Sequence, residues 1–143
     1  MKRDVPRPLA FACAAGLLGL GVVALRPAPR VGLHVVQMTS RGAGPRFEPA
    51  EIALRAGDTI RFINRRGGPH NVQFFIDSVA AGARSLLDSA IGESRIGPLA
   101  ARLLWDAEES YTLVVPDLEP GRYPFVCAPH FTAGMTGALI VTP

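Results

Sequence analysis

The stretch YPFVCAPHFTAGMTG, residues 123–137, places a cysteine, a histidine and a methionine within nine residues of one another near the end of the chain. These are Cys127, His130 and Met135, whose side chains are the donor types that soft and borderline metals prefer. The whole chain holds only two cysteines, three histidines and three methionines, so this short loop gathers one of each. The spacing Cys-x2-His-x4-Met therefore predicts a metal-binding loop.

The number of available donors limits which metal the loop can hold. A structural zinc site or an iron–sulfur cluster needs more cysteines than this chain has. A thiolate, two imidazoles and a weak axial thioether form the ligand set of a blue-copper site. The second imidazole then comes from elsewhere, and His70 is the better candidate because it follows the turn GGP, in which Pro69 restricts the backbone. His34 is the other candidate, but its place within a predicted strand is more typical of a half-exposed strand residue.

The chain from residue 31 onward has the pattern of an all-β domain. Short apolar runs separated by Gly- and Pro-containing turns predict six or seven strands, a number typical of a sandwich or barrel. The predicted strands lie at residues 33–39, 47–56, 59–64, 70–75, 110–115, 122–127 and 137–142. Residues 77–106 are rich in Ala, Leu and Ser instead, and they predict one or two short helices, with residues 78–91 as the better candidate.

Two segments together resemble the cupredoxin family, in its plastocyanin-like and azurin-like branch. These are GGPHNVQF (residues 67–74) and GRYPFVCAPHFTAGMTGALIV (residues 121–141), and the resemblance covers roughly residues 33–143. It implies a Greek-key β-sandwich with a partly helical excursion around residues 77–106. It also implies one type 1 copper ion bound by His70, Cys127, His130 and Met135. Asn71 matches the family position that helps to tie the two ligand loops together.

Residues 1–30 have the pattern of a targeting segment. A basic start, MKRDVPRP, precedes Leu9–Leu25, which is seventeen residues without a charge, and the linker RPAPR follows. This order predicts a signal peptide or a membrane anchor, with the copper domain at residues 31–143. Cleavage signals near Leu25 are poor, so we expect the segment to be retained. Cys13 lies inside the apolar run, which leaves Cys127 as the only cysteine of the domain.

The basic isoelectric point of the chain does not indicate nucleic-acid binding. Residues 1–30 carry five basic groups against one acid, and removing their net +4 from the total of +3 leaves about −1 for residues 31–143. A nearly neutral domain lacks the basic surface that phosphate binding requires. We expect Arg65, Arg66 and the acidic run Asp106, Glu108 and Glu109, which lie near the predicted site in sequence, to be simply solvated.

These observations predict an extracytoplasmic, for example periplasmic, one-electron carrier. No open metal position or nucleophile–base pair is visible, so we do not expect an enzyme. The expected partners are redox proteins of a respiratory or photosynthetic chain that dock near His130, and the expected state is a monomer. The alternative is a copper protein for storage or delivery. A two-copper oxidase centre would need a second cysteine in the loop, which residues 128–131 do not contain.

Overall fold

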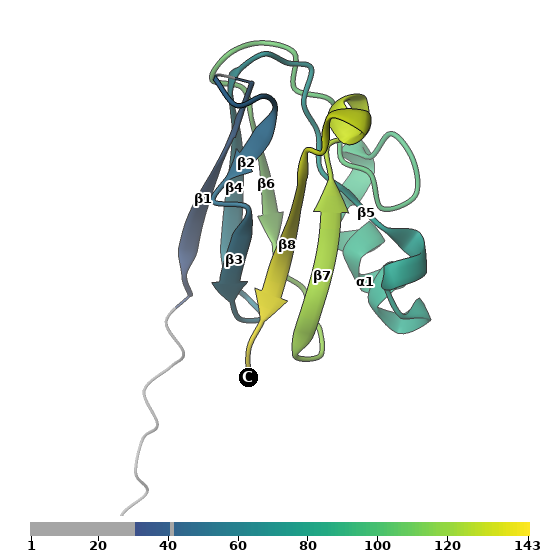
Figure 1. The fold of residues 1–143 in the computed structure, drawn as a ribbon. Coiled ribbons are helices and arrows are strands. Elements are labelled where there is room, and N and C mark those ends of the chain that lie inside the picture. Colours follow the sequence, from purple (N-terminus) through teal and green to yellow (C-terminus); the bar gives the residue numbers. More distant parts are fainter. Residues whose placement is uncertain (1–30, 41) are drawn as a thin grey trace, which may run out of the picture.

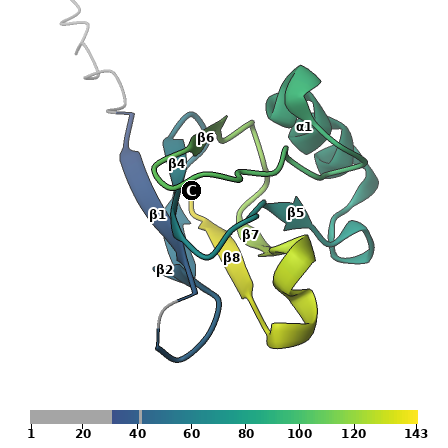
Figure 2. The same cartoon turned by 90° about the horizontal axis from the view of Figure 1, so that it is seen from above.

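A computed structural model describes residues 31–40 and 42–143, and they form two β-sheets packed face to face (Figure 1). The first sheet has the strand order β2-β1-β4-β6, and the second has the order β3-β8-β7-β5. The strands are β1 (Leu33–Thr39), β2 (Arg46–Glu48), β3 (Glu51–Leu54), β4 (Thr59–Arg66), β5 (Gln73–Phe74), β6 (Ser110–Val114), β7 (Gly121–Val126) and β8 (Thr136–Val141). Figure 2 shows the two layers from above, with helix α1 (Ala81–Ile91) beside β5. The predicted all-β sandwich is therefore confirmed.

Alternation of apolar and polar residues positions the strands on the core. On β4, Ile60 and Phe62 are fully buried, whereas Arg61 between them is exposed. Phe62 lies edge-on to Phe125 of β7, with 5.7 Å between the ring centroids, so the two central strands meet through aromatic side chains. Side chains alternate between the two faces of a strand, so the residues two positions away from Phe62 and Phe125 also lie on the buried faces.

The structure differs from the sequence prediction at residues 47–56. We expected one strand there, but the chain forms β2 in the first sheet and β3 in the second. The break falls at Pro49, which has no backbone N–H to donate to a sheet ladder. The chain thus crosses from one layer to the other at this residue.

The predicted strand at residues 70–75 is also shorter than expected. Only Gln73 and Phe74 form β5, and His70 makes an isolated bridge with Leu104. The excursion after β5 contains α1 and two short 3₁₀ turns. The prediction of one or two short helices in this segment is therefore confirmed. Leu87 and Ile91 of α1 are buried against the sandwich, so the excursion is part of the packed domain.

Among residues 31–40 and 42–143, no helix is long and apolar enough to cross a membrane. The apolar segment Leu9–Leu25, predicted as a signal or anchor, lies outside the described residues.

Candidate metal centre

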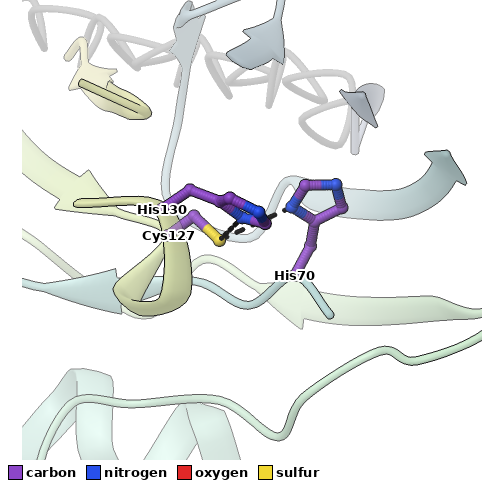
Figure 3. A group of neighbouring side chains, drawn as sticks. All are labelled: His70, Cys127 and His130. Atoms are coloured by element: carbon purple, nitrogen blue, oxygen red, sulfur yellow. Dashed lines mark hydrogen bonds between the residues drawn. The ribbon is translucent and has the colours of Figure 1, made fainter. Parts of the chain in front are cut away.

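Three of the predicted ligands lie together at one end of the sandwich. The Cys127 sulfur Sγ is 3.4 Å from Nδ1 of His130 and 3.6 Å from Nδ1 of His70 (Figure 3). Within the described part of the chain, these three are the cluster of potential His, Cys or carboxylate ligands, and their donor atoms all lie within 4.8 Å of one another. His70 and Cys127 are completely buried and His130 is half-buried. The site is therefore closed on the protein side and reaches the surface at His130.

Backbone hydrogen bonds hold the loop between β7 and β8. The Cys127 N–H donates to the Met135 carbonyl at 3.0 Å, and the His130 N–H donates to the Cys127 carbonyl at 3.0 Å. A short 3₁₀ segment, Ala128–Ala133, carries His130 and ends at Gly134, whose φ of 79° is left-handed and suits glycine. Met135 is fully buried directly after this turn. The loop thus begins at Cys127 and brings Met135 back beside it.

His70 is positioned by a different part of the chain. Its backbone pairs with Leu104 in both directions, at 3.0 and 2.8 Å, so the end of the excursion clamps this residue. Its ring nitrogen Nε2 lies 3.0 Å from the Arg66 carbonyl. A carbonyl can only accept a hydrogen bond, so Nε2 carries the proton and Nδ1 presents its lone pair toward Cys127. The imidazole therefore has the tautomer that metal binding through Nδ1 requires.

Asn71 ties the two ligand loops together, as the family resemblance implied. Its side-chain oxygen accepts from the Ala128 N–H at 2.8 Å, and its side-chain nitrogen donates to the Ala101 carbonyl at 3.3 Å. Asn71 is 1% exposed, so water does not compete for these bonds. One buried amide thus links the His70 loop, the Cys127 loop and the end of the excursion.

Gly68 allows the turn before His70 to approach the excursion closely. A Cβ atom at this position would lie 2.6 Å from Nδ2 of Asn64 and 3.0 Å from the Leu104 carbonyl. That same Asn64 nitrogen donates to the Leu104 carbonyl at 3.1 Å. Glycine at position 68 therefore leaves room for the clamp that holds His70.

Burial of the site shifts the pKa values of two predicted ligands, Cys127 and His70. Burial raises the pKa of the Cys127 thiol, and hydrogen bonds from the backbone N–H groups of Asn71 and His130 oppose that rise. Burial lowers the pKa of His70, whose bond to the Arg66 carbonyl opposes the shift and whose proximity to His130 adds to it. In the metal-free protein, burial thus favours the uncharged form of both side chains.

The donor geometry fits one metal ion. Nitrogen and sulfur atoms bound to one first-row ion at about 2.0 and 2.3 Å lie roughly 3.5 Å apart in tetrahedral or trigonal geometry. The two sulfur–nitrogen distances of 3.4 and 3.6 Å match that separation. The cysteine and the two histidines therefore have the donor types and the sulfur–nitrogen separations that suit a bound copper ion.

Two expectations about charged residues near the site need correction. Glu109 is not simply solvated, because its carboxylate accepts from the backbone N–H groups of Trp105 and Asp106 and contacts Arg102. Arg65 forms an ion pair with Glu108. The Arg65–Glu108 pair joins residues that are far apart in the chain, whereas Glu109 accepts from N–H groups only three and four positions before it.

His34, the second histidine candidate, does not join the cluster. Its Nε2 lies 3.1 Å from the Asp58 carboxylate, at the start of β1 and β4. The half-exposed strand position predicted for His34 is confirmed, and its carboxylate partner is an addition from the structure.

Comparison with known proteins agrees with this site. Residues 34–142 match the family model "Copper binding proteins, plastocyanin/azurin family". The chain is 34% identical over 140 residues to the plastocyanin minor isoform of Arabidopsis thaliana, covering 94% of this chain and 76% of that protein. It is 32% identical over 123 residues to plastocyanin of a Synechococcus strain, covering 86% of this chain and 83% of that protein.

Solved structures show the same similarity. Oxidised plastocyanin from Dryopteris crassirhizoma superposes with a TM-score of 0.57 at 30% identity, covering 76% of this chain and 99% of that one. A Sinorhizobium pseudoazurin gives a TM-score of 0.52 at 26% identity, covering 79% and 76%. Plastocyanin-like cupredoxins are copper-dependent electron carriers rather than enzymes. The chain therefore belongs to the plastocyanin/azurin family of copper-binding proteins.

Proposed function

We propose that the protein is an extracytoplasmic one-electron carrier with one type 1 copper site formed by His70, Cys127, His130 and Met135. The observation that carries the proposal is the placement of the Cys127 sulfur 3.4 and 3.6 Å from two imidazole Nδ1 atoms. Met135, buried at the end of the same loop, would supply the weak axial thioether.

The role of the protein is to keep these ligands still. Copper, when bound, supplies a one-electron couple between its cupric and cuprous states. The Leu104 clamp and the Arg66 carbonyl fix His70, while Asn71 ties its loop to that of Cys127. Ligands braced in this way change position little between the two states, and a small structural change favours fast electron transfer.

We propose that redox partners dock on the surface around His130. No charged residue occurs between Tyr123 and Pro143, and Phe131, next to His130, is 52% exposed. Phe131 lies edge-on to Phe75 and lines a groove of about 540 Å³ that Ile76 also lines. This surface is mostly apolar and aromatic, and Asp77 is the one charged residue that lines the groove. Such a surface beside a half-buried ligand suits brief docking of an apolar face on a redox protein of a respiratory or photosynthetic chain.

We propose that the protein is exported and that its copper domain comprises residues 31–143. A basic start, seventeen uncharged residues at Leu9–Leu25 and a Pro/Arg linker support export, with retention as an anchor. Residues 31–143 then form the copper domain outside the cytoplasm. Sequencing the N-terminus of the mature protein tests retention, and a start at or after Leu25 would show that the segment is a cleaved signal.

The decisive experiment compares electron exchange with copper exchange. We expect the copper-loaded protein to exchange electrons reversibly with a c-type cytochrome or an inorganic couple in stopped-flow mixing, and to retain copper over many cycles. His130→Gly should open the site and perturb both exchanges. Phe131→Ser should slow exchange with the protein partner while leaving exchange with the inorganic couple nearly unchanged.

Leu86→Ser on α1 is the matched control for Phe131→Ser, because Leu86 is also an exposed apolar residue, at 41%. It should alter neither rate. If copper passes to an apo-acceptor faster than electrons pass to the cytochrome, the protein delivers copper, and the carrier proposal is wrong.

A further inference from the structure

The outer face of the first sheet carries exposed apolar side chains near the beginning of β1. Leu33 is 70% exposed and Val35 is 44% exposed, and both point to the same face because they are two residues apart on the strand. Val31, directly before the strand, is 68% exposed. On the edge strand β6, Val114 is 56% exposed. These four residues, which we name the β1/β6 surface, are almost half of the nine large apolar side chains exposed in the described residues.

Strand register brings the members of the β1/β6 surface into neighbouring rows. Leu33 pairs with Thr59 on β4, and Thr59 pairs with Val114 on β6. Val35 pairs with Arg61, which pairs with Thr112 in the next row. Neither row contains an acidic side chain. The surface is therefore an apolar and hydroxyl-bearing patch with one arginine in its middle.

The chain itself indicates what lies beside this surface. The uncharged segment Leu9–Leu25 ends six residues before Val31, and the linker between them carries Arg26 and Arg30. Six residues span at most about 20 Å when fully extended. A bilayer that holds Leu9–Leu25 would thus lie within reach of the β1/β6 surface. Arg26, Arg30 and Arg61 have the charge that suits anionic phospholipid headgroups.

The metal centre lies at the other end of the sandwich. β1 begins at the end where the C-terminus lies, whereas the Ala128–Ala133 segment caps the opposite end (Figure 1). The seven residues of β1 separate the two ends by about 20 Å. A membrane on the β1/β6 surface would leave the surface around His130 free for partners.

We propose that the β1/β6 surface rests on the lipid bilayer to which the N-terminal segment anchors the protein, with Val31, Leu33, Val35 and Val114 at the boundary between the headgroups and the acyl chains. This inference rests on the proposed anchoring. It adds a defined orientation: the beginning of β1 and the end of β6 contact the lipid, and the copper loop lies at the opposite end of the strands.

Tryptophan fluorescence of the full-length chain in anionic vesicles tests the orientation. The native chain has a single tryptophan, Trp105, which is 64% exposed. It directly follows Leu104, the residue whose backbone pairs with that of His70. In a Trp105→Phe background, Leu33→Trp and Val114→Trp each place an indole on the β1/β6 surface. Both positions are exposed strand residues, so the larger ring meets no packed neighbour. Ala53→Trp, exposed on β3 of the other sheet, is the matched control.

We expect phospholipids brominated on their acyl chains to quench the indoles at positions 33 and 114, and to leave those at positions 53 and 105 unquenched. Vesicle sedimentation is measured in parallel, so that anchoring and orientation are judged separately. If the protein sediments with vesicles but the indole at position 33 is unquenched, anchoring stands and the orientation is wrong. A blue-shifted but unquenched indole would show that protein, such as a second copy, covers the surface. Failure to sediment would overturn both proposals.

Discussion

Removing the Asn71 side chain should weaken the fold at the joint between the two ligand loops. Asn71→Ala deletes an acceptor 2.8 Å from the Ala128 nitrogen and a donor 3.3 Å from the Ala101 oxygen. Ala101 is fully buried, so its carbonyl loses a partner that water cannot replace. An unsatisfied buried group costs about 1–3 kcal/mol, and a lost bond at a half-exposed group costs about 1 kcal/mol. The free energy of unfolding should therefore fall by about 2–4 kcal/mol.

Urea unfolding of the copper-free protein measures this loss, and Gln73→Ala is the matched control. Gln73 is a half-buried amide two residues away, and its side chain has no hydrogen bond among the described residues. Its truncation should change the free energy of unfolding by less than about 0.5 kcal/mol. The copper-loaded Asn71→Ala protein should also release copper faster to a chelator. Equal unfolding midpoints for the two variants would refute the role we assign to Asn71.

Three further predictions concern the metal ligands and the opposite end of the sandwich. Cys127→Ser should abolish the intense blue colour of the Cu(II) protein while the far-ultraviolet spectrum stays unchanged; a colourless wild-type complex would rule out a type 1 site. Met135→Leu, nearly volume-conserving at a buried position, should keep the colour and raise the reduction potential, because a weak donor to Cu(II) is lost; loss of copper binding would contradict a merely axial role. Backbone N–H groups of Arg55 and Gly32, with His34, lower the pKa of Asp58 below its ordinary value of 3.8, so its stabilising contribution is present above that pH and is lost as the pH falls through the folded value. Unfolding curves of wild type and Asp58→Asn should therefore differ at neutral pH and converge in acid, and a constant difference across the titration would exclude this linkage.

Several features of the protein follow from local sequence alone. The alternation in residues 59–64 places Ile60 and Phe62 in the core, and both are fully buried. The Ala- and Leu-rich composition of residues 78–91 predicts the helix that the structure has at Ala81–Ile91. The Cys-x2-His-x4-Met spacing likewise determines that two donors and a thioether share one loop. Such features are readable because strand and helix periods, and the donor chemistry of single residues, are properties of neighbouring positions.

Other features depend on residues that are far apart in the chain. The Nδ1 lone pair of His70 points to Cys127 because Nε2 donates its hydrogen to the Arg66 carbonyl. The backbone of His70 is held by its hydrogen bonds with Leu104. The crossing between β2 and β3 follows from the sheet partners available on each side of Pro49, and no local period of residues 47–56 reports it. The ion pair between Arg65 and Glu108 likewise forms only once β4 and the loop before β6 are packed together. In each case the deciding interaction is a contact made or a partner chosen during packing, which the pattern of one segment does not contain.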